Sequence, residues 1–235
     1  GMVRDLMRFY REAPALLASQ DPGPTLGDYL EQHRYGSAFR SDHLIPMASA
    51  LWSAPAARIL DFPARYLVQF MANHQMLQVS QRPEWRVVQG GSSRYIHALR
   101  ERWNVLVRLN CPVHAVTRQA GGVVVTSCDG QPHYDEVIFA CHSDQALKLL
   151  ADPTPAERQV LGAIPYQHND VVLHTDARLL PRRRKAWAAW NAYVPADPSA
   201  PCSVSYCMNL LQGLSSRLPF IVTLNRSEAI DPAHV

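Results

Sequence analysis

The chain has 235 residues, of which 47% are hydrophobic and 18% are charged. At roughly 100–200 residues per domain, this length can bury one substantial core or two small ones. No apolar stretch approaches the roughly 20 residues that cross a bilayer, so we expect a soluble protein without a membrane span. The net charge of +3 comes almost wholly from arginine, and we expect no nucleic-acid partner.

One basic run, Arg182–Lys185, departs from this even distribution of charge. It follows Pro181 and precedes a tryptophan-rich segment, with no basic helix nearby. A solvated turn is the simpler interpretation. A patch for a phosphate, a partner or a nucleic acid is the alternative.

The five cysteines are odd in number and include no C-x-x-C pair. Such usage is typical of a reducing compartment, and we expect a cytoplasmic protein without a signal peptide. Cys202 and Cys207 lie on one predicted strand at a spacing that points their side chains to opposite faces. His168 and His174 share a face but lack a third ligand. We therefore expect no metal site.

Residues 1–84 have the pattern of a helical region. Before Pro14 ends the first run, four apolar residues recur at helix spacing: Val3, Leu6, Met7 and Tyr10. Thr25 with Asp28 forms a capping box for the next helix. Pro46 interrupts a later helical pattern, which predicts two short helices there.

Residues 85–150 have the pattern of a strand-rich unit. Residues 113–118 alternate in polarity, Gly121-Gly122 can form a turn, and residues 123–128 form a returning apolar run, which predicts a β-hairpin. A second turn follows at Asp129-Gly130. We expect a third strand after it.

That third strand is predicted at Asp135–Cys141, a dense apolar run typical of a strand covered on both faces. Ser143 can cap the helix that follows. Ala140 and Cys141 would then lie at the carboxyl end of a buried strand, where open α/β sheets bind ligands.

Residues 151–235 begin with a capping box, Thr154 with Glu157, and continue as a strand-rich region. Apolar runs separated by proline and aspartate turns predict an antiparallel sheet. The expected strands are residues 170–175, 186–193, 203–208 and 220–224.

Four ordered segments of this chain resemble a known group of proteins: residues 43–47 with 51–53, residues 73–77, residues 85–95, and residues 139–144. The group is the flavin-dependent amine oxidase superfamily, which includes monoamine oxidase, protoporphyrinogen oxidase and carotenoid desaturase. The chain is most similar to a bacterial branch described as FAD/NAD-binding and amine oxidase-like. The resemblance runs from about Asp21 to the C-terminus.

The resemblance implies an α+β fold for this chain, and an α/β fold for the intact protein. Residues 85–150 would be a fragment of an FAD/NAD(P)-binding nucleotide unit. Residues 151–235 would form the antiparallel sheet of a substrate domain, with residues 1–84 as its helical cover. The two outer segments would then make one domain in space.

The family's pyrophosphate-binding motif, G-x-G-x-x-G after a buried strand, does not occur in this sequence. We therefore expect the chain to be an internal piece of a longer flavoenzyme. The intact protein would bind FAD, whereas this chain alone would lack it and be inactive. Without its neighbours, Asp135–Cys141 would be an open sheet edge that favours self-association.

For cofactor contact, the resemblance points to Val113, whose backbone would pair with the adenine edge. Ala140 and Cys141 are the next candidates, at the end of the predicted strand. Ordinary β-sheet core is the alternative for all three. No residue can be assigned a catalytic role, because in such enzymes the cofactor carries the chemistry.

For substrate contact, the candidates are two groups of polar and aromatic residues. The sheet would supply Trp187, Trp190, Asn191 and Tyr206, with Tyr193 nearby, and the helical cover would supply Asn73 and His74. Aromatic core residues and a core histidine are the alternatives.

The function implied by the resemblance is oxidation of a C–N or C–C bond by hydride transfer to flavin. The substrate would be a small, apolar molecule of unidentified structure. The alternative is a non-catalytic module that binds a hydrophobic ligand or a protein, which the missing phosphate loop would favour.

Overall fold

A computed structural model describes residues 1–235 except 53, 55, 82, 167 and 196–201. Ser53, part of one resembling segment, thus lies outside the described residues. The chain forms two compact units. The first combines Gly1–His97 with Asn169–Val235, and the second is Ala98–His168. None of the described helices is long and apolar enough to cross a membrane.

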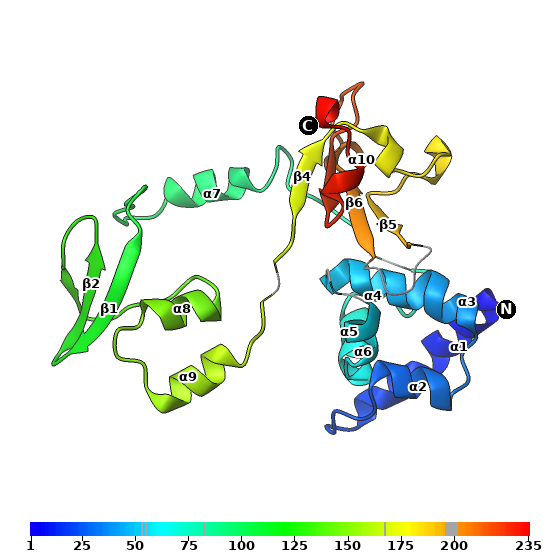
Figure 1. Ribbon diagram of the computed structural model, residues 1–235, viewed down its shortest axis with the longest axis horizontal. Coiled ribbons are helices and arrows are strands. Elements are labelled where there is room, and N and C mark those ends of the chain that lie inside the picture. Colours follow the sequence, from blue (N-terminus) through cyan, green and yellow to red (C-terminus); the bar gives the residue numbers. More distant parts are fainter. Residues whose placement is uncertain (53, 55, 82, 167, 196–201) are drawn as a thin grey trace. The chain divides into compact units, whose positions relative to one another are not determined.

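The N-terminal part of the first unit is helical (Figure 1). Its elements are α1 (Met2–Glu12), a 3-10 helix (Ala13–Ala18), α2 (Leu26–Gln32), α3 (Ser37–Phe39), a π-helical turn (Arg40–Leu44), α4 (Ile45–Trp52), α5 (Ala56–Leu60) and α6 (Ala64–Asn73). Pro14 lies just beyond the end of α1, as expected. The Asp28 N–H donates to Thr25 Oγ1 at 3.1 Å, which confirms Thr25 as the N-cap of α2, but the Asp28 carboxylate accepts from the Thr25 hydroxyl and the expected capping box is incomplete.

Two short α-helices form in this region, as expected, but a π-helical turn separates them and the interruption expected at Pro46 itself is absent. The chain runs from α3 through the π-helical turn into α4. In this turn the Ile45 N–H donates to the Arg40 carbonyl, five residues back. Because Pro46 has no N–H to donate, the wider turn lets its ring enter the helix without ending it.

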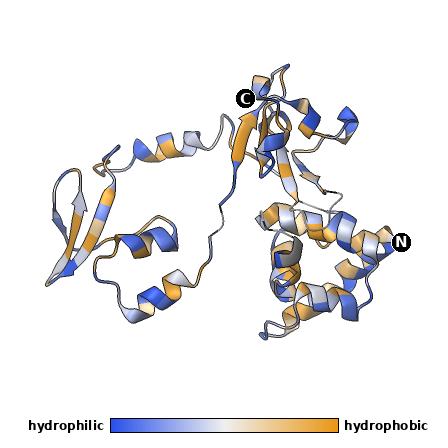
Figure 2. Ribbon diagram, viewed as in Figure 1, coloured by the Kyte–Doolittle hydropathy of each residue, from blue (hydrophilic) through white to orange (hydrophobic). Residues whose placement is uncertain are grey.

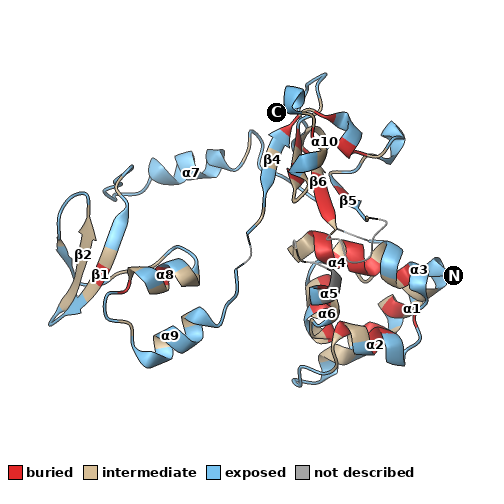
Figure 3. Ribbon diagram, viewed as in Figure 1, coloured by how far each residue is buried: buried red, intermediate tan, exposed pale blue. Residues whose placement is uncertain are grey.

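The helical part has a dense core (Figure 3). Its largest fully buried members include Phe9, Leu26, Leu30, Phe39 and Leu67, none more than 1% exposed. Burying one such side chain contributes about 1.5–3 kcal/mol relative to leaving it in water. The helices are therefore held together by contacts within this part of the chain.

The C-terminal part of the first unit contains a four-stranded sheet. Its strands are β4 (Val171–His174), β5 (Trp190–Tyr193), β6 (Ser203–Cys207) and β7 (Ile221–Leu224), with α10 (Met208–Gln212) after β6. Their order is β4-β7-β6-β5, and each neighbouring pair is antiparallel, which confirms the expected antiparallel sheet. β5 is shorter than expected because Arg184–Ala186 is a 3-10 turn, so Trp187 precedes the strand.

The second unit contains a hairpin and two helices. The hairpin is formed by β1 (Val113–Gln119) and β2 (Gly122–Ser127), to which β3 (His133–Tyr134) adds a short third strand. Gly121, with φ of +82°, lies in the turn, so the predicted hairpin is confirmed. The helices are α8 (Ser143–Leu149) and α9 (Pro155–Gly162); α7 (Ser93–Arg100) spans the limit between the two units.

The strand expected at Asp135–Cys141 does not form, and that prediction is wrong. β3 ends at Tyr134, and the following residues have no ladder partner in the described part of the chain. Ile138 is 90% exposed, whereas Val137 and Phe139 are half-buried. An inner strand of a buried sheet needs a hydrogen-bonded strand along each edge, and the described residues supply neither. The α/β character predicted for a nucleotide unit is therefore not seen here.

The cap expected at Ser143 lies one residue earlier. His142 is the N-cap of α8, and its N–H donates to the Gln145 side chain at 3.2 Å. Ser143 is the first helical residue, and its hydroxyl donates to the Leu161 carbonyl at 3.0 Å. This hydrogen bond joins α8 to α9. The capping box of α9, Thr154 with Glu157, is confirmed.

A disulfide joins Cys111 to Cys128, which corrects the expectation that every cysteine is reduced. Cys111 precedes β1 and Cys128 follows β2. The hairpin register, with Val113 opposite Ser127, brings the two together. This pairing depends on a fold-level contact, and no C-x-x-C spacing signals it. Cys141, Cys202 and Cys207 are free.

Candidate functional site

One face of the four-stranded sheet carries an apolar row. The antiparallel register aligns one residue from each strand, and we name these four the apolar row: Leu173, Val222, Tyr206 and Trp190. Leu173 is 59% exposed and Trp190 is 46% exposed, while the two central members are half-buried. Contiguous exposed apolar surface of this kind marks contact sites for ligands or partners.

The two aromatic members of the apolar row form an edge-to-face pair. The ring centroids of Trp190 and Tyr206 are 5.2 Å apart, with an interplanar angle of 79°. Burial raises the pKa of the Tyr206 hydroxyl, so this side chain stays neutral at physiological pH. The structure thus brings together two of the residues predicted to contact substrate, on a surface suited to an apolar molecule.

The opposite face of the sheet carries a buried polar row. The Asp176 N–H donates to Nδ1 of His174 at 3.1 Å, so the ring proton lies on Nε2 and is donated to Thr223 Oγ1 at 2.7 Å. Thr223 Oγ1 lies 2.8 Å from Ser205 Oγ. A slip of one residue would place these polar groups on the other face, so the row fixes the strand register.

Asn191, a predicted substrate residue, belongs to this polar face. Its amide group donates to the Ala188 and Ser205 carbonyls at 2.6 and 3.1 Å. Its side-chain oxygen accepts from the Ala188 N–H at 3.0 Å. Asn191 therefore lies on the face opposite Trp190, and its side-chain amide is already hydrogen-bonded within the protein.

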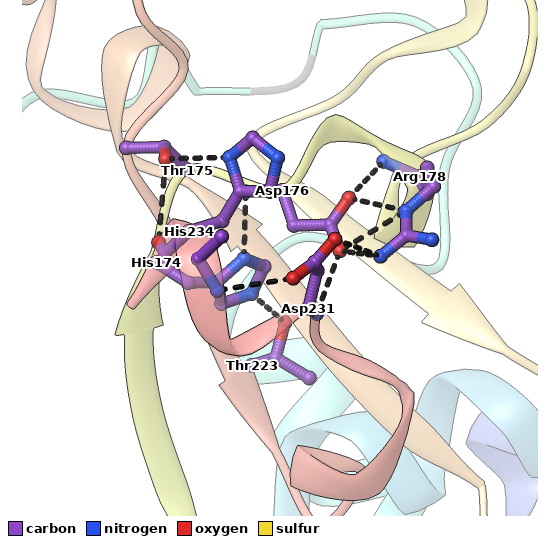
Figure 4. Close-up of polar contacts among 8 residues, drawn as sticks. His174, Thr175, Asp176, Arg178, Thr223, Asp231 and His234 are labelled. Atoms are coloured by element: carbon purple, nitrogen blue, oxygen red, sulfur yellow. Dashed lines mark hydrogen bonds and ion pairs between the residues drawn. The ribbon is translucent and has the colours of Figure 1, made fainter.

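A buried carboxylate anchors the end of the chain beside the polar row (Figure 4). Asp176 accepts from the Arg178 guanidinium at 2.6 and 2.9 Å and from the Asp231 N–H at 3.0 Å. The Arg178 contact, followed by the backbone donors, holds the pKa of Asp176 far below its usual range. Burial lowers the pKa of His174. The Thr175 N–H also donates to the His234 carbonyl, so residues 231–235 are tied to β4.

Trp187, a third predicted aromatic contact, lies in a different environment. Its Nε1 donates to the Pro181 carbonyl at 2.8 Å, and its ring packs against the buried residues Leu180, Cys207 and Ile221. Tyr193 is covered by the Arg226 guanidinium, 3.5 Å from the ring centroid. Neither residue belongs to the apolar row.

Asn73 and His74 lie at the end of α6, and both are exposed. Asn73 Oδ1 accepts from the Gln69 amide at 2.9 Å. The His74 ring lies near Phe70 and Trp85, with centroid distances of 4.2 and 6.0 Å. Within the described part of the chain, neither side chain forms a hydrogen bond or a ring contact with the apolar row.

The residues expected near a cofactor all lie in the second unit. Val113 opens β1 and is 39% exposed, and an irregularity in the pairing follows it before Ala115. Ala140 and Cys141 are exposed in the extended segment before α8. Cys141 also lines an open hollow of about 790 Å³, which Val137, Phe139 and other residues of this unit complete.

The hollow does not suit a pyrophosphate. Three of its lining residues are acidic, namely Asp135, Glu136 and Glu157, and its one arginine, Arg118, already pairs with Glu157. At the start of α8, the Ser143 N–H donates to the Tyr166 hydroxyl at 2.9 Å. This hollow therefore does not fit the diphosphate of FAD.

Sequence reasoning missed two members of the apolar row, Leu173 and Val222. β4 begins with three apolar residues in succession, Val171 to Leu173 (Figure 2), so no alternation indicated which face was exposed. Only the register across β7 and β6 aligns them with Tyr206 and Trp190.

The helices and the antiparallel sheet together define an α+β protein. Residues 19–189 match the family described as flavin containing amine oxidoreductase, and the chain belongs to that family. No curated protein matches the sequence.

Among solved structures, the chain is similar to a protein from Exiguobacterium sp. 255-15, provisionally assigned as a protoporphyrinogen oxidase. The TM-score is 0.57 at 16% sequence identity, over 91% of this chain and 49% of the other. The likeness shows a shared fold. The chain spans about half the length of that protein.

Proposed function

We propose that this chain forms the substrate side of an FAD-dependent oxidoreductase of the amine oxidase type. The intact enzyme would oxidise a C–N or C–C bond of a small apolar substrate by hydride transfer to flavin. Family membership supports the reaction class. The observation that carries the proposal for this chain is the apolar row, whose two outer members are exposed, on a sheet whose other face is buried.

In this proposal, FAD supplies the redox chemistry, and the chain supplies shape and water exclusion. Trp190 and Tyr206 form an aromatic wall that would orient an apolar substrate. Leu173 and Val222 extend that wall across the sheet. The phosphates of FAD would be held by residues outside the described part of this chain, because its second unit offers them acidic groups.

The test compares the 235-residue chain with a longer product that includes any flanking coding sequence. We expect the longer product to purify with stoichiometric FAD, whose absorption bleaches when an apolar amine is added without oxygen. We expect the 235-residue chain to retain none and to be inactive. Stoichiometric flavin on the short chain, or none on the long one, would contradict the proposal.

A substitution separates the role of the apolar row from cofactor binding. In the longer product, Trp190→Ala should raise KM for the apolar substrate about tenfold while flavin content is unchanged. Trp103→Ala is a matched control, since Trp103 is similarly exposed but lies in the second unit. Equal KM values for the two variants would show that the apolar row does not contact the substrate.

The apolar row also favours a second candidate, a module that binds a hydrophobic ligand or protein without chemistry. A flavin-free longer product that still binds an apolar fluorescent probe, and loses it with Trp190→Ala, would favour this candidate.

A further inference from the structure

A small pocket in the first unit lies apart from the apolar row. It is formed by the 3-10 turn Arg184–Ala186, by α10 and by the loop after α10, and its volume is about 200 Å³. We propose that this pocket binds a phosphate monoester. The proposal does not depend on flavin chemistry, because its site and its test involve neither the cofactor nor the apolar row.

The walls of the pocket are fixed by hydrogen bonds. The Asn209 amide group donates to the Leu218 carbonyl at 3.0 Å, and its oxygen accepts from the Phe220 N–H at 2.7 Å. Gly213, in the left-handed region with φ of +63°, ends α10 and starts the loop. On the other side, the Trp187 ring is held by its hydrogen bond to Pro181. A ligand would thus find the loop already ordered.

Two cationic side chains line the pocket without a carboxylate partner. Arg184 and Arg217 come from different segments, and neither forms an ion pair with any described residue. No acidic residue lines the pocket. The Arg184 guanidinium lies 5.3 Å from the centre of the Trp187 ring. This cation–π contact uses the charge of the guanidinium but none of its N–H donors, which are available to an anion.

A third donor is available at Ser216. Its hydroxyl oxygen accepts from the Leu218 N–H at 3.2 Å, which leaves the hydroxyl proton free to donate. A carboxylate would be satisfied by the fork of a single arginine. Two arginines and a hydroxyl on separate segments instead match a dianionic phosphate, which offers three strong acceptor oxygens. The space beside the Trp187 ring suits a small organic group attached to that phosphate.

The experiment is calorimetric titration of the 235-residue chain with phenyl phosphate and with inorganic phosphate, at constant ionic strength. We expect both to bind in one-to-one stoichiometry, phenyl phosphate more tightly. Arg184→Gln and Arg217→Gln should each weaken binding about tenfold, which is the loss expected for one charge-assisted hydrogen bond. Both side chains are exposed, so circular dichroism should show an unchanged fold.

Arg183→Gln is the matched control, since Arg183 has the same charge and exposure but does not line the pocket. We expect it to change the affinity less than about twofold. An equal loss with Arg183→Gln, or acetate binding as tightly as phosphate, would show attraction by net charge and overturn the proposal. Absence of binding by both phosphates, or binding of a DNA oligonucleotide alone, would overturn it as well.

Discussion

The two units of the chain carry equally clear apolar patterns but bury them to different extents. In the first unit, Phe9, Leu30 and Leu67 are at most 1% exposed. In the described part of the second unit, the buried apolar residues are Val116, Ala146 and Leu150. In the apolar run Asp135–Cys141 of this unit, Ile138 is 90% exposed. An apolar pattern therefore predicts an element, whereas burial depends on a partner surface.

The polar groups of the two units differ in the same way. In the first unit, the Asp176 side chain is 2% exposed and accepts several hydrogen bonds. In the second unit, Asp152 pairs with Arg118, and both side chains are about two-fifths exposed. Exposed ion pairs contribute little to stability, because water screens them.

The largest expected effect tests the apolar half of this comparison. Leu67→Ala should lower the free energy of unfolding by about 2–5 kcal/mol, because it leaves a cavity in a packed core. Ile138→Ala should change it by less than about 0.5 kcal/mol. Urea unfolding followed by circular dichroism measures both. A cost above about 1 kcal/mol for Ile138→Ala would show that the second unit buries this residue.

The next effect tests the polar half. Asp176→Ala should destabilise the first unit by about 1–2 kcal/mol, a value that allows for screening of the exposed Arg178. Asp152→Ala is the control, and we expect no measurable change from it. Hydrogen exchange of residues 171–175 and 231–235 should rise with Asp176→Ala alone.

The same carboxylate predicts a pH dependence. The pKa of Asp176 is lowered in the folded state, so its contribution is complete above the usual aspartate pKa of about 3.9. That contribution is lost as the pH falls below this value towards the folded pKa. Wild type should therefore lose its advantage over Asp176→Ala in acid. If wild type stayed equally more stable than Asp176→Ala down to the lowest measurable pH, packing of the side chain and not its charge would account for the stability difference.

A third effect concerns the exposed run of the second unit. We predict that the chain self-associates through Asp135–Cys141, because its backbone has no ladder partner among the described residues and Ile138 is 90% exposed. Ile138→Asp should weaken association about tenfold, as the burial of one large side chain would imply. Analytical ultracentrifugation gives the constants, and Leu106→Asp serves as a control at another exposed position. A monomer at all concentrations would contradict this prediction.

The smallest effect compares one local motif in both units. Thr25→Ala and Thr154→Ala each remove an N-cap hydrogen bond and should each destabilise their helix by about 1 kcal/mol. Hydrogen exchange of α2 and α9 measures the loss. Equal losses would show that capping is local and independent of how well a unit is packed. A much larger loss of helix stability for Thr25→Ala would show that the buried core of the first unit depends on the capped end of α2.

Local features of the fold were predictable from the sequence. Three of these features are the helix caps at Thr25 and Thr154 and the turn at Gly121. Each involves residues that are close in sequence, so it forms whatever the rest of the fold is. The approximate positions of the strands in the first unit were also predictable, because each is a local apolar run bounded by turn residues. Of the predicted substrate residues, Trp190 and Tyr206 lie together because the strand register pairs them. Asn191 lies on the opposite face of β5, and Trp187 precedes the strand because a 3-10 turn ends just before it.

The amino-acid sequence by itself determined where helices begin, where chains turn and which family the protein resembles, since these depend on neighbours along the chain. Tertiary structure alone decided the pairing of Cys111 with Cys128, the alignment of Leu173 with Trp190 and the exposure of Ile138. The exposure of Ile138 depends on the lack of a neighbouring strand among the described residues. The disulfide depends on the register of the hairpin, and the alignment of Leu173 with Trp190 depends on the register of strands distant in sequence. Such contacts are cooperative, and no local pattern encodes them.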